Sequence, residues 1–501
     1  MNRLRNVVNN MFISLIGQAV TWASTLILTI AYGRFLSDSS FGELYFAITF
    51  VLLAGFPLEF GFNQQLTREI AQEPHKALRY FSNTILIKSV LWLLLYSFIL
   101  VFCWLLGYNL EVRILVAICG VTLLSTATAN TLAALHYSFG RTVYPALGLV
   151  LEKGLSTLIG VILLRNGFGV ESMALVLLGG SLVSTLWLGF WFFRLVGVGF
   201  TLDRALIREL LRGSIPFLTY GVLGVIYYRL DTVLLSFMTN TAVVGWYGAG
   251  YRLFDTLVFL PNLVIGAIMY PVFSKLSISS EAKLKMAVEK SMNFLLFCGL
   301  PIATLLIVTA PNIIGLLYHQ QDFLHSIPAL QSLAPGLVFL YINTVLSSIL
   351  ISTKREKKIM IMAAIALLFN LTCNLILIPL YQHVGAAVVT SLTEFLLFCI
   401  ALMFVPRSLL PIGSVRVAFK ALLASLAMGL VSALLLSLSS VPGFFLMVVL
   451  PAALLVYLGV AMLLRTIPAE DIQALFSAIR EKKSRAARQS DVEQAPGLEL
   501  E

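Results

Sequence analysis

Long apolar stretches recur along the whole chain, and short segments rich in charged and polar residues separate them. Each stretch is close to the roughly 20 residues that an α-helix needs to cross the hydrocarbon of a bilayer. The pattern therefore predicts an all-α polytopic membrane protein with about fourteen transmembrane helices. The expected spans are 11–31, 41–61, 82–105, 114–135, 144–164, 171–193, 215–237, 244–272, 291–312, 331–352, 359–380, 384–404, 418–438 and 444–465.

The composition agrees with a membrane location. Of the 501 residues 59% are hydrophobic and 12% are charged, whereas about a quarter are charged in soluble domains. The first apolar window follows Arg3 and Arg5 and so imitates the start of a signal peptide. It is longer than the apolar core of such a peptide and no convincing small-residue cleavage site follows, so we expect an uncleaved first span.

The net charge of +10 raises the possibility of a nucleic-acid partner, and the positions of the 34 lysines and arginines decide against it. With a cytoplasmic N-terminus, the loops on the outer side would carry only Arg34, Arg113 and Arg165. Most of the other basic residues would lie in inner segments, as the positive-inside rule requires. We therefore expect a multi-pass protein of the cytoplasmic (inner) membrane with both termini in the cytoplasm and no nucleic acid as partner.

Two parts of the sequence resemble each other weakly. A segment that combines glycine with aromatic residues opens the second span, FGELY at 41–45, and the eighth span, VGWYGA at 244–249. Six spans thus repeat in the same orientation, which predicts two six-helix lobes around a central cavity plus two C-terminal helices. The expected parts are an N-terminal lobe 1–195, a cytoplasmic linker helix 196–214, a C-terminal lobe 215–406, a last helix pair 407–465 and a basic cytoplasmic tail 466–501.

Enzymatic chemistry has no visible motif in the sequence. There is no nucleophile elbow, no Walker A loop and no set of His and Cys residues at metal-binding spacing. The predicted outer loops are also too short for a catalytic domain such as a polysaccharide polymerase or ligase would need. We therefore expect neither an enzyme nor a cofactor. The five cysteines lie in predicted spans without C-x-x-C spacing and are interpreted as small buried residues: Cys103, Cys119, Cys298, Cys373 and Cys399.

Charged residues inside the seventh and eighth spans are the main functional candidates, because a charge in the bilayer must be paired or must face water. Arg229 and Asp231 are two residues apart and point to opposite sides of a helix, so each needs its own partner. Arg252 and Asp255 lie at similar depth on the next span. We expect Arg229 to meet Asp255 or a substrate phosphate, and Asp231 to meet Arg252. The four residues could form a structural ion-pair cluster, or at least one arginine could bind an anion in the cavity.

Other charges lie nearer to the middle of the membrane. Glu152 and Lys153 belong to the fifth span and Glu394 to the twelfth. A carboxylate at this depth could couple transport to a proton or sodium gradient, and Asp231 and Asp255 are further candidates for this role, whereas Lys153 is a candidate substrate ligand. Lys88 lies near the inner end of the third span, and we expect its ammonium group to reach the cytoplasmic headgroups.

Uncharged polar side chains could complete the cavity. Gln18 begins a polar stripe on the first span, and Asn370 and Asn374 lie one turn apart on the eleventh. They are candidate substrate ligands. The alternative is that they form hydrogen bonds between helices.

Four segments taken together resemble a known family: GFNQQLTREIA at 61–71, YYRLDTVLL at 227–235, VGWYGA at 244–249 and NLTCNLILIPL at 370–380. They resemble the polysaccharide-biosynthesis flippases of the multidrug/oligosaccharidyl-lipid/polysaccharide exporter superfamily. The resemblance implies alternating access and a polyprenyl-pyrophosphate-linked oligosaccharide repeat unit as cargo, moved to the outer leaflet for O-antigen, capsule or exopolysaccharide synthesis. It also implies membrane lipids as partners, together with a polysaccharide polymerase and chain-length machinery.

Two other transport functions stay open at this point. A cation-coupled multidrug exporter would share the fold but would be expected to have acidic and aromatic cavity walls. A lipid II flippase would also share it, although the first span carries no charge here, which departs from the cationic cavity of the lipid II flippases.

Overall fold

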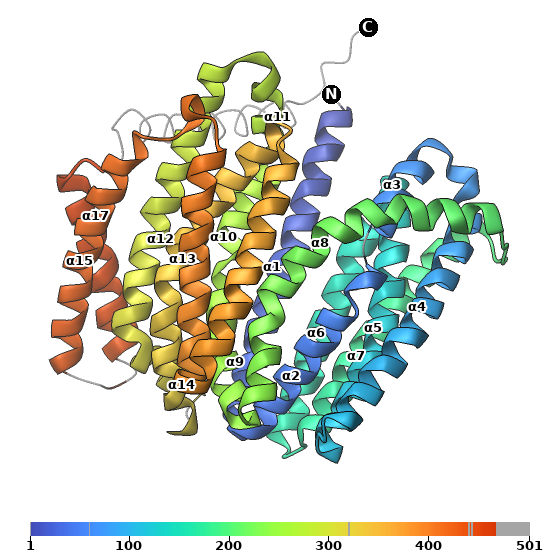
Figure 1. Cartoon of the computed structure of the whole chain (residues 1–501), viewed down its shortest axis with the longest axis horizontal. Helices are drawn as coiled ribbons and strands as arrows, with labels where there is room; N and C mark the ends of the chain where they lie inside the picture. Colours follow the sequence, from blue (N-terminus) through green and yellow to red (C-terminus); the bar gives the residue numbers. More distant parts are fainter. Residues whose placement is uncertain (1, 60, 319–320, 439–440, 442–443, 467–501) are drawn as a thin grey trace, which may run out of the picture. The chain divides into compact units, whose positions relative to one another are not determined.

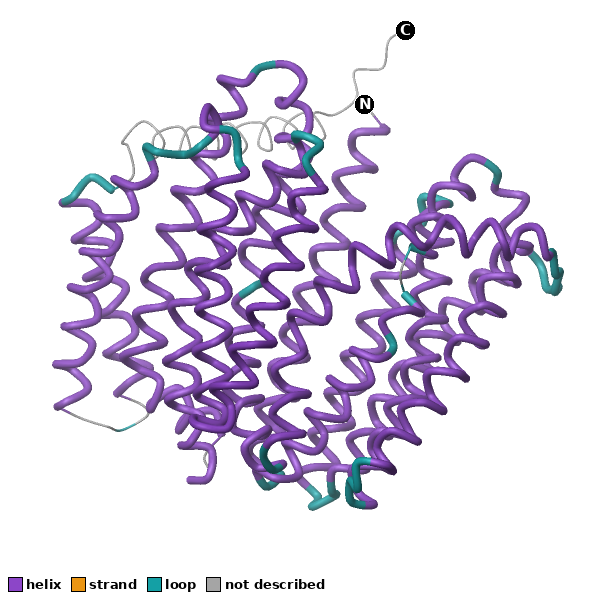
Figure 2. Tube along the Cα trace, in the orientation of Figure 1, coloured by secondary structure: helices purple, strands orange, loops and turns teal. Residues whose placement is uncertain are grey.

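The computed structural model describes residues 2–59, 61–318, 321–438, 441 and 444–466, with the side chains of 2–16, 215–227 and 267 left aside. Residues 467–501 of the expected basic tail lie outside the described residues. Helix runs along almost the whole described trace, which contains no strand (Figure 2). Ten of the described helices are long and apolar enough to cross a membrane, and a pair of helices bent by 47° would add one more. The prediction of an all-α polytopic fold is confirmed.

The long helices follow the predicted spans closely (Figure 1). They are α1 (Asn2–Phe35), α2 (Asp38–Ala54), α4 (Ala77–Leu105), α5 (Leu110–Ser138), α6 (Val143–Arg165), α7 (Val170–Val196), α8 (Arg204–Met238), α9 (Thr241–Leu257), α12 (Glu281–Tyr318), α13 (Ser326–Ser352), α14 (Glu356–Phe404), α15 (Ser414–Leu438) and α17 (Leu450–Leu463). Shorter elements are η1 (Phe56–Leu58), α3 (Phe62–Gln72), η2 (Pro74–Lys76), α10 (Phe259–Pro261), η3 (Asn262–Met269), α11 (Tyr270–Ser279), η4 (Gln321–His325), η5 (Arg407–Leu409) and η6 (Phe445–Val449).

The second predicted span, 41–61, is interrupted in the structure. Helix α2 ends at Ala54, the amide of Gly55 caps its last turn, and a single 3₁₀ turn, Phe56–Leu58, follows with Pro57 at its centre. Proline removes a helical hydrogen-bond donor, which explains the break. Gly61 then adopts a φ of 76°, a left-handed conformation that favours glycine, and leads into α3. Residues 62–72 lie between the predicted spans 41–61 and 82–105, where no helix was expected, so α3 was missed.

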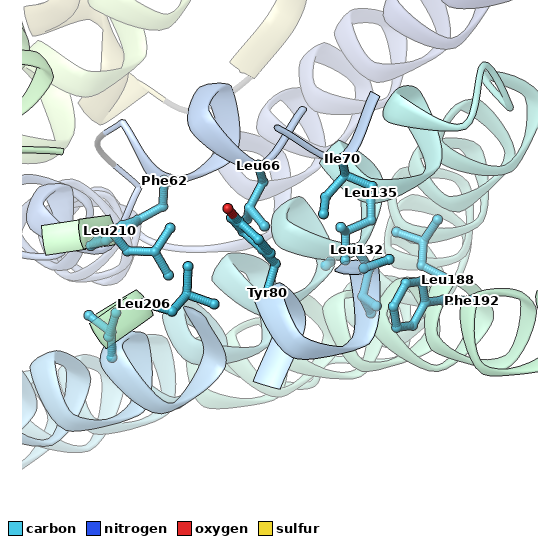
Figure 3. Packing of buried hydrophobic residues seen from close by; sticks show 13 residues of the cluster. Phe62, Leu66, Ile70, Tyr80, Leu132, Leu135, Leu188, Phe192, Leu206 and Leu210 are labelled. Atoms are coloured by element: carbon cyan, nitrogen blue, oxygen red, sulfur yellow. The ribbon is translucent and has the colours of Figure 1, made fainter. Parts of the chain in front are cut away.

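Helix α3 is amphipathic, and its apolar face is part of a buried cluster (Figure 3). Phe62, Leu66 and Ile70 repeat every four residues and are at most 2% exposed. Figure 3 shows them beside Tyr80 of α4 and Leu132 of α5. Burying a large apolar side chain stabilises a fold by roughly 1.5–3 kcal/mol. The cluster therefore fixes α3 against α4, α5, α7 and α8.

The predicted linker helix and the seventh span form one continuous helix, α8. Figure 1 shows a single ribbon whose first turns run across one end of the molecule and whose later turns run lengthwise. Asp203 caps its start by accepting hydrogen bonds from the amides of Ala205 (2.8 Å) and Leu206 (3.3 Å). The same carboxylate forms an ion pair with Arg79 of α4. The start of α8 is therefore attached to α4.

The eleventh and twelfth spans are joined within α14. The helical run is interrupted at Gln382, whose φ of 50° and ψ of −129° are not helical. This break lies between the predicted spans 359–380 and 384–404, where the sequence pattern placed it. Gly385 follows it, and a Cβ there would be 2.5 Å from the carbonyl oxygen of Leu377. This glycine allows the two halves of α14 to approach each other closely.

The chain forms two compact units. The first contains Met1–Tyr270 and Ala310–Val405, and the second contains Pro271–Thr309 and the chain from Pro406 onward. The functional candidates belong to the first unit. We call its end where α1 gives way to α2 and α8 gives way to α9 the far end, and the opposite end, where α3 lies, the amino end (Figure 1). In the second unit, α15 and α17 pack together through Ala424, Met428 and Tyr457. The division into two lobes stays a prediction.

Candidate functional site

At the far end, α2 and α9 touch through their backbones. A Cβ on Gly42 would overlap the carbonyl oxygen of Thr241, and a Cβ on Gly245 would overlap that of Asp38. Only glycine at both positions permits this approach. Beside it, the indole of Trp246 donates a hydrogen bond of 2.9 Å to Asp38 Oδ2. The two Gly-aromatic segments that resemble each other in the sequence are thus in direct contact.

A second set of bonds lies at the same end. Arg34, at the end of α1, donates hydrogen bonds of 2.8 Å each to the carbonyl oxygens of Leu316 and Leu317 in the last turn of α12. A cation beside the carbonyl end of a helix is also favoured by the helix dipole. Next to it, the hydroxyl of Tyr318 donates to the carbonyl oxygen of Ala249 at 3.0 Å. The far end of the first unit is therefore closed.

A cavity of about 410 Å³ lies between α1, α2, α5, α6 and α7. We call it the central cavity. Polar residues line much of its wall, and one residue of α9, Arg252, completes it. The volume is in the range typical of small-molecule sites. The polar lining residues are Thr21, Ser24, Thr25, Thr29, Tyr32, Thr122, Thr126, Glu152, Lys153, Ser156, Thr157 and Arg252.

Arg252 has no ion-pair partner among the described residues. Its guanidinium carbon lies 5.9 Å from the centre of the Tyr45 ring, and its Nε is buried without a hydrogen-bond partner. The predicted pairing of Arg252 with Asp231 is therefore wrong. A permanent cation in a cavity wall without a protein counter-charge is suited to an anionic ligand.

Arg229 has a protein partner. Its terminal nitrogen lies 3.1 Å from Asp255 Oδ2, across the interface between α8 and α9. The guanidinium also lies 5.9 Å from the centre of the Tyr251 ring. This is the pairing that depth matching suggested, and it leaves the charge of Arg229 compensated.

Asp231 turns to the other side of α8, as the spacing of two residues requires. It is 3% exposed. Its carboxylate accepts hydrogen bonds from the amide of Thr232 at 2.7 Å and from the hydroxyl of Tyr247 on α9. The Tyr247 hydroxyl lies 3.5 Å from Thr390 Oγ1 of α14. A phenol and a backbone amide, rather than an arginine, therefore satisfy this carboxylate. The sequence reasoning considered only charged partners.

Glu152 and Lys153 lie together in the wall of the central cavity. The ammonium group of Lys153 is 2.7 Å from Glu152 Oε1. With Arg252, the cavity wall thus carries two basic groups and one acidic group. Gln18, although exposed on the same helix as the threonine stripe, is not among the lining residues.

Three of the predicted site residues are buried on α14 and line none of the described cavities: Glu394, Asn370 and Asn374. Asn343 of α13 donates a hydrogen bond of 2.8 Å to Glu394 Oε2. Asn374 donates to Asn370 Oδ1 at 2.9 Å, and Asn370 donates to Thr393 Oγ1 at 3.4 Å. The structure therefore connects these residues to neighbouring turns and helices and does not bring them to Arg252.

Lys88 does not reach the membrane surface, so that prediction is wrong. Its side chain is 1% exposed. The ammonium group lies 3.6 Å from a carboxylate oxygen of Glu59, 3.3 Å from Asn63 Oδ1 and 3.2 Å from the carbonyl oxygen of Ala127. The break after α2 places Glu59 inside the first unit, where it offers the lysine a counter-charge. Glu59, near the end of the predicted span 41–61, was the feature of the sequence that could have indicated this partner of Lys88.

No metal site accompanies these groups in the part of the chain that the structure describes: nowhere do three His, Cys, Asp or Glu side chains come together as a metal ion would require. The described functional candidates are therefore two ion pairs, one carboxylate bound to tyrosine and one arginine without a partner.

Known proteins resemble this chain in sequence and in fold. An uncharacterized membrane protein of Methanocaldococcus jannaschii is 27% identical over 208 residues, which is 40% of this chain and 41% of that relative. The alignment thus spans only about two fifths of the curated relative. A structure of the lipid II flippase MurJ in an inward closed conformation matches with a TM-score of 0.76 at 19% identity, over 91% of this chain and 99% of that chain.

A multidrug resistance MATE family transporter of the MOP superfamily, in an inward-facing conformation, matches with a TM-score of 0.65 at 15% identity, over 78% of this chain and 97% of that chain. At these identities the two structures establish the fold. The family model of the lipid II flippase MurJ matches residues 155–453, and that of the polysaccharide biosynthesis proteins matches residues 7–277. Each model covers more than half of the chain, which therefore belongs to the polysaccharide biosynthesis protein family and also matches the model of the lipid II flippases.

Proposed function

We propose that the protein is a flippase for a polyprenyl-pyrophosphate-linked oligosaccharide repeat unit. It would move this cargo from the inner to the outer leaflet of the cytoplasmic membrane for O-antigen, capsule or exopolysaccharide synthesis. The family of polysaccharide biosynthesis proteins supports the choice of cargo. The positions of the basic residues support a cytoplasmic amino end with both termini inside.

The observation that carries the proposal is Arg252. Its charge has no described protein partner and it completes the wall of the central cavity. A pyrophosphate that leaves water needs a counter-charge and several hydrogen bonds, and a guanidinium group provides both. Lys153 lies in the same wall and could contribute a second cation. No covalent bond of the cargo changes, so the site has to bind and release rather than catalyse.

The closed far end supports an alternating-access cycle. With α2 and α9 in contact, cargo would enter from the amino end, the proposed cytoplasmic side. Release to the outer leaflet would need the far-end contacts to separate. The polyprenyl tail would stay in lipid during this movement, because burying its hydrocarbon elsewhere brings no gain.

We propose that an ion gradient drives the cycle and that Glu152 is one coupling group. It is paired with Lys153 in the cavity wall at 2.7 Å. A cargo phosphate that binds Lys153 would compete with this pair and release the carboxylate from its counter-charge. Asp231, Asp255 and Glu394 stay alternative coupling groups, for protons or for sodium.

Transport of a fluorescent polyprenyl-pyrophosphate-linked sugar in proteoliposomes tests the proposal. Arg252→Gln should lower the transport rate at least about tenfold, the effect expected when a charge-assisted hydrogen bond worth roughly 1.5–3 kcal/mol is lost. Arg252→Lys should retain part of the activity. The matched control is Arg165→Gln, which removes an exposed arginine at the end of α6 that lines neither the central cavity nor the other described hollows, and it should stay close to wild type. Unchanged transport by Arg252→Gln would refute the role of this residue.

A lipid II flippase is a second candidate, favoured by the match of the MurJ model to residues 155–453 and by the similarity of the folds. The two cargoes share the polyprenyl pyrophosphate and differ in the sugar and peptide. Competition between the two lipids in the same proteoliposomes would distinguish them. The better substrate is the one whose excess abolishes transport of the other.

A multidrug exporter is less well supported. The described central cavity carries Arg252 and Lys153 against Glu152, which does not favour cationic drugs. A deletion strain with unchanged drug susceptibility and a loss of surface polysaccharide would support the flippase. We further propose that polysaccharide polymerase and chain-length proteins act beside it, which cross-linking in the native membrane would detect.

A further inference from the structure

A second hollow follows the central cavity along the same helices. It has a volume of about 590 Å³ and is lined by residues of α3, α5, α6 and α7. We call it the amino-end hollow, because α3 forms part of its wall. Arg252 does not line this hollow.

The two spaces adjoin. On α5, Thr122 and Thr126 line the central cavity, and Asn130 and Tyr137 line the amino-end hollow. These positions recur at intervals of one or two turns and so lie on one face of the helix. On α6, Glu152 belongs to both walls. One helix face therefore lines both spaces in succession from the amino end to the cavity of Arg252.

The chemistry of the two walls differs. The central cavity holds Arg252 and the Glu152–Lys153 pair. The hollow shares Glu152 and has Arg68 as its basic residue, and the rest of its wall combines apolar residues such as Leu149 and Leu188 with five neutral polar ones: Asn63, Gln64, Thr67, Asn130 and Ser184. Amides and hydroxyls both donate and accept hydrogen bonds, which suits sugar hydroxyls. The ring of Tyr137 adds a flat apolar surface with a polar hydroxyl.

The polar groups of the hollow are held in place. Asn130 donates a hydrogen bond of 3.0 Å to Glu59 Oε1, and Asn63 donates one of 2.8 Å to Glu59 Oε2. Lys88 binds the same carboxylate from the buried side. A fixed amide loses less entropy when a ligand binds than a mobile one would. The ion pair of Lys88 and Glu59 thus orients two amides in the wall of the hollow.

We propose that the amino-end hollow is a saccharide subsite that holds the sugar of the cargo while Arg252 holds its phosphate. The proposal rests on the flippase function proposed above and assigns the parts of the head group to separate places. From Thr122 to Asn130 the rise along α5 is about 12 Å. A lipid-linked sugar is long enough to reach both regions, with its sugar toward the amino end.

Binding measurements on the purified full-length protein in nanodiscs test this subsite. The two probes are undecaprenyl pyrophosphate and the same lipid with one N-acetylhexosamine attached. The wild type should bind the sugar-bearing lipid about tenfold more tightly, which corresponds to one or two additional hydrogen bonds. Asn130→Leu and, separately, Gln64→Leu should reduce this preference to less than about twofold and leave the affinity for the bare lipid unchanged.

The control is Asn166→Leu, at the opposite end of α6 and outside both cavities. It should keep the full preference for the sugar. Asn130 also supports Glu59, and the exposed Gln64 keeps the test decisive if the Asn130 variant folds poorly. A wild type that binds both lipids equally, or a Gln64 variant with an unchanged preference, would overturn the subsite. If the wild type binds neither probe, the proposed function itself fails.

Discussion

The indole of Trp246 donates a hydrogen bond to the carboxylate of Asp38, and this bond connects α9 to α2 beside the glycine contact at the far end. Asp38 is also the first residue of its helix, where a negative charge is favourable. The bond thus joins the start of one helix to the side of another. Breaking it should favour separation of the far end.

We expect Trp246→Phe to keep the ring packing and to lose only this hydrogen bond. The far end should then open more often, by about tenfold for a hydrogen bond to a charged group. A cysteine introduced at Ser39, whose hydroxyl lies 2.6 Å from that of Thr241 across the α2–α9 contact, should react faster with a membrane-impermeant thiol reagent in this variant. Equal labelling rates in the two backgrounds would show that the bond does not hold the far end closed.

The glycine contact gives a stronger prediction. Gly42→Ala or Gly245→Ala would place a methyl group against a backbone carbonyl that cannot move aside as a side chain can. Overpacking of this kind costs about 1–3 kcal/mol. Both variants should be deficient in transport because the closed form becomes less populated. The control is Gly179→Ala on α7, where a Cβ meets no atom within 4 Å. Its transport should match the wild type, and a similar loss there would point to a general effect of alanine.

The ion pair of buried Lys88 and partly exposed Glu59 allows a test of stability. Lys88→Met removes the cation, and because Glu59 is 29% exposed and keeps two amide donors, the cost should be smaller than the roughly 3–5 kcal/mol of a fully buried pair. The melting temperature of the purified protein should fall by several degrees. The double variant Lys88→Met/Glu59→Gln removes both charges and should recover much of the loss. Absence of any recovery would mean that lysine acts through packing and not through charge.

The proposed coupling role of Glu152 predicts a change in the response to a proton gradient. Glu152→Gln preserves the shape of the side chain and cannot gain or lose a proton. Transport in proteoliposomes should become insensitive to an imposed pH gradient, while Lys153 remains available for the phosphate. If the gradient still accelerates transport as in the wild type, the coupling group has to be sought at Asp231 or Glu394.

The sequence was sufficient to predict most of the long helices and the pairing of Arg229 with Asp255. It did not predict that Arg252 lines the central cavity without an ion-pair partner. Depth along a helix follows from counting residues, so Arg229 and Asp255 could be matched. Rotation about the helix axis depends on packing, which is why Arg252 was assigned to Asp231 although Tyr247 occupies that position. Neutral donors are not visible as partners in a count of charges.

Packing that is not visible in the sequence pattern also explains the errors at Lys88 and α8. A lysine near a predicted helix end was expected at the surface, because the break after Ala54 that brings Glu59 inward was not recognised. The signals, Gly55 and Pro57, were present in the sequence. In α8, the polar start was interpreted as a separate helix, whereas its apolar contacts through Leu206 and Leu210 continue the helix inside the first unit.

The position of Arg252 on α9 also makes the affinity of the cavity depend on the conformation of the protein. The rest of the described wall belongs to α1, α2, α5, α6 and α7. In the proposed opening, α9 would separate from α2 and carry its arginine away from the threonines of α1 and from Lys153. The proposed anion would then lose its strongest ligand when the far end opens, so a single helix movement would both expose the cargo and weaken its binding.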